Sequence, residues 1–182
     1  EKSQRLAIAI KNKNRETINL QSISTHGVKV FQKGAHVSCG FLPIGKRGTN
    51  NISIIVEGYA TGASIHEATG HYVIIAFNCG NLKPVAQTMR ESLPDARIII
   101  AADDDHLTKG NPGKTKAEEA AVAVGATVVL PDFGNERPEK ATDFNDLHCF
   151  KGLDAVKKCF KTIPETMKIS LADTGLEDRP KE

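Results

Sequence analysis

Hydrophobic and polar residues alternate along the first part of the chain. The alternation covers residues 5–11, 17–23 and 28–31, and polar turn residues separate the three stretches. A period of two is typical of strands that bury one face and expose the other. Short strands joined by short turns pair with their neighbours, so this part predicts a small antiparallel β meander.

From residue 52 onward the pattern changes to short apolar runs separated by amphipathic stretches. The apolar runs cover residues 52–56, 71–77, 97–102 and 126–130. Helical periodicity marks residues 60–69, 82–93, 115–124 and 143–160. Strands that alternate with helices predict a parallel sheet with right-handed crossovers. We therefore expect an α/β, Rossmann-like fold, with about four parallel strands and helices on both faces of the sheet.

This change of pattern divides the 182 residues into three segments. We expect a small N-terminal β subdomain with a basic linker at 1–50, a catalytic domain at 51–160, and a polar tail or linker at 161–182. The chain begins at Glu1, which suggests a fragment or a processed product. It has no secretory signal, and no apolar run near the roughly 18 residues that span a bilayer. These features predict a cytoplasmic protein without membrane contact.

Charge is distributed unevenly between the segments. Residues 1–51 carry nine Lys or Arg and two acids, whereas residues 52–182 carry fifteen and twenty. A basic front on an acidic body suits a partner with a phosphate backbone, although a solvated lysine-rich surface has the same composition. Within the basic part, Lys46 and Arg47 of the linker are candidates for nucleic-acid contact.

Acidic residues follow two of the predicted strands directly. Glu57 comes after the run at 52–56, and Asp103, Asp104 and Asp105 come after the run at 97–102. Side chains alternate along an extended chain, so Asp103 and Asp105 point the same way and Asp104 points elsewhere. Three acids in succession repel one another, and a cation relieves the repulsion. Glu57, Asp103 and Asp105 therefore predict a site for a hard divalent cation such as Mg²⁺.

These acids belong to a series of motifs that resembles the Toprim domain of topoisomerases and primases, and most closely the primases of plasmids, phages and other mobile elements. The motifs are VEGYA at 56–60, AFNCGNL at 76–82, IAADDD at 100–105 and TDFNDLH at 142–148. Their order and spacing match that group, and the similarity extends over residues 6–160. The resemblance implies a Toprim fold for the catalytic domain.

The resemblance also implies an activity. A primase of this group is a nucleotidyltransferase that joins ribonucleotides on a single-stranded DNA template, using ribonucleoside triphosphates. Asp103 and Asp105 would hold Mg²⁺, for which Mn²⁺ can substitute. Glu57 would act as general acid or base, or as a further metal ligand, and Gly58 would leave room for the nucleotide. Family members often carry zinc-binding and helicase domains as well, and the four cysteines form no zinc-ribbon spacing here.

Several assignments remain open. Asp143 and Asp146 would add contacts around the metal or nucleotide, or they would simply cap a helix. The segment from Gly110 to Thr115 lacks the glycine spacing of a Walker A loop, so we interpret it as a flexible loop with Thr115 as a helix cap. Its one lysine and the lysines that flank the segment are candidates for phosphate contact: Lys114, with Lys109 and Lys116.

One departure from the family concerns the residues after Gly58. Replicative bacterial primases have an aspartate shortly after this glycine, whereas this chain has Tyr59, Ala60 and Thr61. The departure favours the plasmid and phage branch and removes one possible metal ligand. Two alternatives to a primase use the same acids: a Toprim nuclease that hydrolyses phosphodiesters, and a metal-dependent nucleic-acid-binding module without activity of its own.

Overall fold

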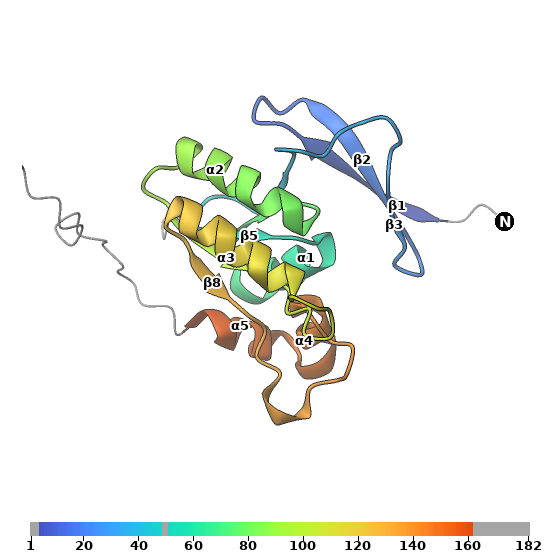
Figure 1. Ribbon diagram of the computed structural model, residues 1–182, viewed down its shortest axis with the longest axis vertical. Coiled ribbons are helices and arrows are strands. Elements are labelled where there is room, and N and C mark those ends of the chain that lie inside the picture. Colours follow the sequence, from blue (N-terminus) through green and yellow to red (C-terminus); the bar gives the residue numbers. More distant parts are fainter. Residues whose placement is uncertain (1–3, 49–50, 162–182) are drawn as a thin grey trace, which may run out of the picture.

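The computed structural model describes residues 4–48 and 51–161, so the predicted tail lies outside the described residues apart from Lys161. The N-terminal part is a three-stranded antiparallel sheet in the order β1-β2-β3, set to one side of the main body (Figure 1). Its strands are β1 (Arg5–Lys11), β2 (Thr17–Ser24) and β3 (Lys29–Phe31). This confirms the predicted meander.

The main body is built around a five-stranded sheet in the order β4-β6-β5-β7-β8. Its strands are β4 (Leu42–Ile44), β5 (Ile52–Val56), β6 (Tyr72–Ile75), β7 (Arg97–Ala101) and β8 (Thr127–Val129). The last four are parallel to one another, as predicted, whereas β4 pairs with β6 in the antiparallel sense. Strand β4 was not predicted, because it has three residues and contains Pro43.

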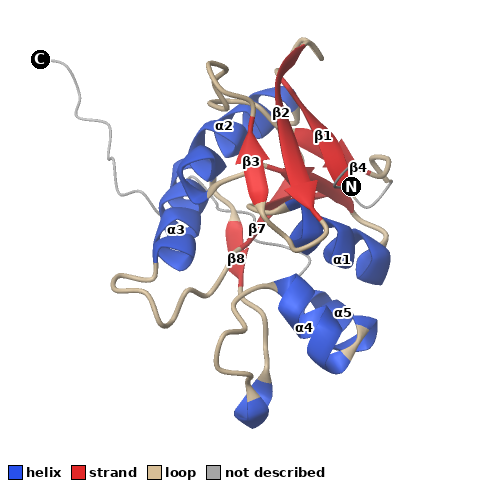
Figure 2. Cartoon of the chain, turned by 90° about the vertical axis from the view of Figure 1, so that its right-hand side faces the viewer, coloured by secondary structure: helices blue, strands red, loops and turns tan. Residues whose placement is uncertain are grey.

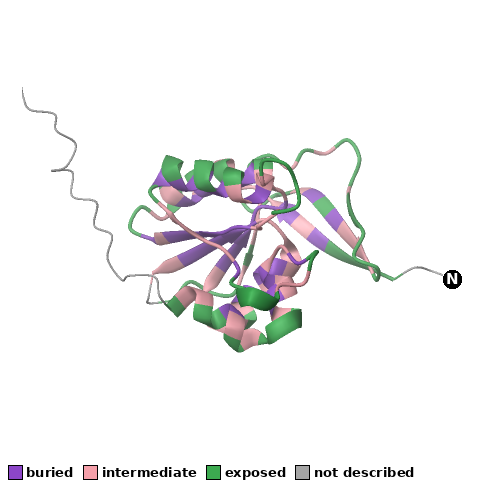
Figure 3. Cartoon of the chain, turned by 60° about the horizontal axis from the view of Figure 1, so that its bottom comes forward, coloured by how far each residue is buried: buried purple, intermediate pink, exposed green. Residues whose placement is uncertain are grey.

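Helices cover both faces of this sheet. They are α1 (Tyr59–Thr69), α2 (Leu82–Ser92), α3 (Pro112–Val124), α4 (Phe144–Lys151) and α5 (Leu153–Lys161), with short 3₁₀ turns η1 (Cys79–Asn81) and η2 (Gly134–Glu136). Helices α2 and α3 pack on one face and α1, α4 and α5 on the other, and each helix turns its exposed residues outward (Figures 2 and 3). No helix of the described part is long and apolar enough to cross a membrane.

The start of α3 differs from the prediction. The helix begins at Pro112, and its N-cap is Asn111 in the left-handed region at φ 42°. The side chain of Asn111 accepts a hydrogen bond from the backbone of Lys114. The hydroxyl of Thr115 donates to the carbonyl of Gly110 instead of capping the helix. The prediction of a flexible loop up to Thr115 was therefore wrong.

Strand order locates the place where a ligand can bind. From β5 the chain crosses to β6 on one side, whereas from β7 it crosses to β8 on the other. The adjacent strands β5 and β7 thus form a switch point, and open α/β sheets bind ligands outside the carboxyl ends of such strands. Val56 lies opposite Ala101 in this pair, so the residues that follow both strands emerge side by side.

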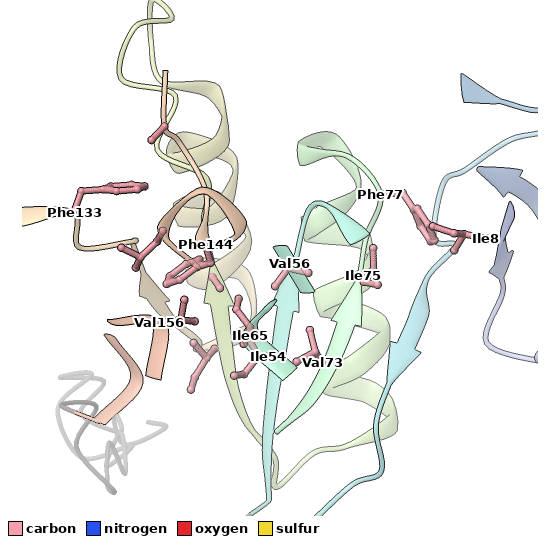
Figure 4. Close-up of a cluster of buried hydrophobic side chains, with 14 of the residues drawn as sticks. Ile8, Ile54, Val56, Ile65, Val73, Ile75, Phe77, Phe133, Phe144 and Val156 are labelled. Atoms are coloured by element: carbon pink, nitrogen blue, oxygen red, sulfur yellow. The ribbon is translucent and has the colours of Figure 1, made fainter. Parts of the chain in front are cut away.

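The core on the α1 side depends on Phe144. Its side chain is fully buried within the hydrophobic cluster (Figure 4). Its ring lies 5.2 Å from the ring of Phe160, centroid to centroid. We expect Phe144→Ala to lower the free energy of unfolding by about 3–5 kcal/mol, because the cavity cannot fully collapse. Urea denaturation measures this loss. The control Phe150→Ala removes a ring that is 41% exposed and should cost less than about 1 kcal/mol; equal losses would contradict the packing role of Phe144.

Candidate active site

Four carboxylates gather at the carboxyl ends of β5 and β7. Glu57 directly follows β5, and Asp103 and Asp105 follow β7. Asp143, which precedes α4, completes what we term the acidic cluster: Glu57, Asp103, Asp105 and Asp143. Their proximity is electrostatic as well as topological, because the charges of the other three each raise the pKa of Asp103.

Asp103 lies at the centre of the acidic cluster. Burial, followed by the charges of Glu57, Asp143 and Asp105, raises its pKa to about 8. Its Oδ1 atom is buried and has no hydrogen-bond partner among the described residues. A buried carboxylate oxygen without a partner is costly, and a cation would relieve both the missing contact and the repulsion.

Glu57 faces the same space from β5. Burial raises its pKa, and the negative charge of Asp105 adds to the effect. Two groups act in the opposite direction: the ammonium of Lys29 and the backbone N–H of Cys79, which donates a hydrogen bond to the carboxylate. The Glu57 carboxyl is thus held in place by η1, the turn that follows β6, while its pKa stays above the ordinary value.

Asp105 is held by the first turn of α3. Its Oδ2 atom accepts a hydrogen bond of 2.9 Å from the backbone N–H of Gly113. A side chain at position 113 would not fit, since a β-carbon there would lie 2.7 Å from the Asp103 carbonyl oxygen and 2.9 Å from Asp105 Oδ2. Gly113 therefore allows the helix to approach the strand end that carries the acids.

Asp104 points away from the acidic cluster, as the alternation predicts. Its carboxylate pairs with Arg137 at 2.5 Å and accepts a 2.6 Å hydrogen bond from Asn111. Burial alone would raise the pKa of Asp104, but the hydrogen bonds from Arg137 and Asn111, together with the positive charge of Arg137, lower it. Asp104 is therefore ionised, and its contacts with Arg137 and Asn111 give it a structural role.

Asp143 and Asp146 have different surroundings. The two residues form a capping box at the start of α4, in which each side chain accepts from the other's backbone N–H. The Asp146 carboxylate also accepts a hydrogen bond from the backbone N–H of Thr142, so its contacts serve the helix cap. Asp143 additionally accepts a 2.9 Å hydrogen bond from the hydroxyl of Thr61, and its charge reaches Glu57 and Asp103. Asp143 thus caps α4 and also lies close enough to the acidic cluster to act there. For Asp146 the structure favours the capping role.

Lys29 is a residue that the sequence analysis missed. It lies on β3 of the small sheet, and a β-carbon at Gly58 would be 3.6 Å from its Nζ atom. Its charge lowers the pKa of Glu57 and of Asp103 against the larger effect of burial. The available signal was its register: Lys29 is on the same side of β3 as Phe31, which packs against the core.

Asn81 fixes the loop between β3 and β4 to the main body. This residue is 3% exposed, and its amide donates to the carbonyls of Val37, Gly40 and Ala76. Its Oδ1 atom accepts from the backbone N–H of Cys39. Asn78 is the N-cap of η1, the turn that contains Asn81. The motif AFNCGNL therefore combines a cap, a clamp and the N–H that holds Glu57.

The other basic candidates lie elsewhere. Arg47 donates to Asn51, whose amide in turn binds the Asp95 carbonyl, so it sits at the amino ends of β5 and β7, with Lys46 beside it. Two of the remaining three face neighbouring acids on the exposed side of α3, in the pairs Lys114–Glu118 and Lys116–Glu119. Lys109 is exposed in the loop before that helix. None of these five is joined to the acidic cluster by a described contact.

The acidic cluster fits a divalent cation in its chemistry. It offers oxygen ligands, excess negative charge and the unpartnered Oδ1 of Asp103. Within residues 4–48 and 51–161, however, no three His, Cys, Asp or Glu side chains already stand in a metal-binding arrangement. Binding a cation therefore requires these carboxylates to turn toward a common point.

Comparison with known proteins agrees with this geometry. Residues 52–154 match the family described as the Toprim domain. The chain is 35% identical over 168 residues to a DNA primase TraC of Escherichia coli, covering 86% of this chain and 16% of that protein. A second E. coli protein of that name is 42% identical over 123 residues, covering 63% and 8%. The chain thus spans a small part of these relatives.

Solved structures share the fold. The primase fragment of the bacteriophage T7 primase-helicase superposes with a TM-score of 0.62 at 16% identity, over 87% of this chain and 62% of that one. The RNA polymerase domain of Mycobacterium tuberculosis primase DnaG gives 0.58 at 14% identity, over 86% and 54%. At these identities the likeness establishes the fold, and it confirms the α/β architecture expected from the sequence.

Proposed function

Because the chain belongs to the Toprim domain family, we propose that it is the catalytic part of a DNA primase of the plasmid and phage type. Such an enzyme is a nucleotidyltransferase that makes RNA primers on single-stranded DNA from ribonucleoside triphosphates. The observation that carries this proposal is the acidic cluster at the β5–β7 switch point, with the unpartnered oxygen of Asp103 at its centre. The relatives named DNA primase TraC support the same reaction.

The proposed cofactor is Mg²⁺, with Mn²⁺ as a substitute. Asp103, Asp105 and Glu57 would hold it, and a bound ion would neutralise phosphate charge and favour ionisation of the attacking hydroxyl. Asp103 offers its unpartnered Oδ1, and Asp105 is oriented by Gly113. Asp143 would contribute negative charge from the far side, and Asp146 would keep the start of α4 in place.

We assign proton transfer to Glu57 and phosphate contact to Lys29. Glu57 has a raised pKa in the metal-free protein, which brings its proton exchange closer to neutral pH, where acid–base catalysis is efficient. Lys29 projects beside Gly58, the residue that leaves this approach open. Lys109, Lys114 and Lys116 near the start of α3, and Lys46 and Arg47 at the amino edge, remain predicted nucleic-acid contacts.

The remaining expectations concern the surroundings of the domain. We propose that the small sheet with its linker (1–50) and the catalytic domain (51–160) work as one unit, followed by a tail or linker (161–182). Zinc-binding and helicase domains are the expected partners in a longer protein, and the cytoplasm is the expected compartment.

One incubation tests the proposed reaction. It contains single-stranded DNA labelled at its end, labelled ribonucleotides and Mg²⁺ or Mn²⁺, and it is repeated with the double variant Asp103→Asn/Asp105→Asn. We expect short ribonucleotide products that disappear in the variant. Shortened DNA would instead identify a nuclease. Binding of DNA without either product would identify a binding module, and both of these results would overturn the primase assignment for this chain.

A further inference from the structure

Arg137 joins the segment before α4 to Asp104 at the end of β7, 33 positions away in the sequence. Its guanidinium donates to Asp104 Oδ2 at 2.5 Å and to the Asp104 carbonyl at 2.9 Å. It also donates twice to the carbonyl of Ala141, at 2.8 and 2.6 Å, and it lies 4.8 Å from the ring centroid of Phe133. Both members of the Arg137–Asp104 pair are about one-fifth exposed, at 22% and 21%, so the pair is shielded from solvent.

Asp104 extends this connection in two further directions. Its Oδ1 atom accepts from Asn111, the N-cap of α3, and its backbone N–H donates to the carbonyl of Thr142 at 2.8 Å. Thr142 immediately precedes Asp143 of the acidic cluster. The pair therefore links the end of β7, the start of α3 and the segment that leads into α4, and each of these carries a member of the cluster or a group that holds one.

We propose that Arg137 is a positioning residue for the divalent cation site, and that it acts through Asp104 on the two flanking acids. This inference rests on the proposed function, in which Asp103 and Asp105 hold the cation. Arg137 holds the carboxylate of Asp104, and this contact fixes the backbone from which Asp103 and Asp105 project. The same guanidinium binds the carbonyl of Ala141, and this contact keeps Asp143, two residues further on, close to Asp103.

The expected effect lies in cation affinity. The carboxylates repel one another and must turn toward a common point, and a backbone that is already fixed reduces the ordering required on binding. Loss of a residue that orients metal ligands typically weakens affinity by about 10–100-fold. We expect Arg137→Met to raise the Kd for Mn²⁺ by this factor. Arg137→Lys keeps the charge but loses the forked donors, and it should be intermediate.

Mn²⁺ binding to the 182-residue chain, without DNA or nucleotides, tests this directly by calorimetry or electron paramagnetic resonance. Arg90→Met is the matched control. Arg90 also donates to three backbone carbonyls, those of Val124, Pro94 and Ala96, but it does so at the amino edge of the sheet. Arg90→Met should lower the free energy of unfolding by about as much as Arg137→Met and leave the Kd for Mn²⁺ unchanged.

A double-mutant cycle with Asp104→Ala tests the route. If Arg137 acts mainly through Asp104, Arg137→Met has a much smaller effect on the Kd in the Asp104→Ala background, where only its contact with Ala141 remains. A full effect in that background would overturn the route, and an unchanged Kd in Arg137→Met would overturn the positioning role. If Arg137→Met does not fold, Arg137→Lys and Asp104→Asn decide in the same way. A wild-type chain that binds no Mn²⁺ would refute the proposed function and this role together.

Discussion

Glu57→Gln should lower the rate of primer synthesis by about 10²–10⁴-fold, the usual contribution of a positioned acid or base. Glutamine keeps the size of the side chain and can still accept the hydrogen bond from Cys79, but it cannot exchange a proton. Single-turnover primer synthesis measures the loss. DNA binding should remain, because the substitution removes a negative charge.

Mn²⁺ affinity of the same variant separates the two roles of Glu57. An unchanged Kd together with a slow reaction would assign proton transfer, whereas a weakened Kd would assign metal ligation. The control is Glu67→Gln, an exposed acid on α1. It should leave the rate unchanged, and a rate within about tenfold of wild type in Glu57→Gln would contradict any catalytic role for this residue.

Asp103→Asn should abolish primer synthesis and at the same time stabilise the metal-free protein at high pH. The pKa of Asp103 is about 8 in the folded chain, against an ordinary value of 3.8. Below the ordinary value, folded and unfolded states both carry the proton, and no difference arises. As pH rises toward 8, only the unfolded state releases it, so the wild-type free energy of unfolding falls. Asparagine has no such proton, and the variant avoids this loss.

Urea denaturation in a chelator, at pH 5 and pH 8.5, measures the difference. We expect the variant to be more stable than wild type by at least about 2 kcal/mol at pH 8.5, and the gap to narrow at pH 5. Mg²⁺ should stabilise wild type at pH 8.5 and have little effect on the variant. Asp95→Asn, at an exposed position on the opposite edge of the sheet, is the control. The same pH dependence in Asp103→Asn and wild type would contradict the burial of this charge.

Local pattern was sufficient for the residues that follow strands. Glu57 and Asp103 could be placed together because β-branched runs identify β5 and β7, and because parallel strands end at the same edge. Val56 pairs with Ala101, so the residues that follow the two strands lie next to each other. The membership of Asp105 in the same group follows from side-chain alternation.

Residues that act across the fold could not be found in this way. Lys29 and Arg137 reach the cluster region from the small sheet and from the segment before α4, and no periodicity relates them to the acids. For Arg137 the only sequence signal was indirect: Asp104 lies between two acids that face the other way, so its own carboxylate needs a partner of opposite charge. The α3 boundary failed for another reason, since Asn111 and Thr115 are both good caps and only the left-handed backbone at Asn111 decides between them.

The contacts of Asn81 imply an uneven tolerance to sequence change around the small sheet. Asn81 binds Val37, Cys39 and Gly40 through their backbone atoms alone, so the first two can be replaced without losing a hydrogen bond to Asn81. Gly40 cannot, because a β-carbon there would lie 2.5 Å from a methyl carbon of Ile10. Relatives can therefore diversify the side chains of this loop while the loop keeps its attachment to the main body beside the acidic cluster, provided that Asn81 and Gly40 are kept.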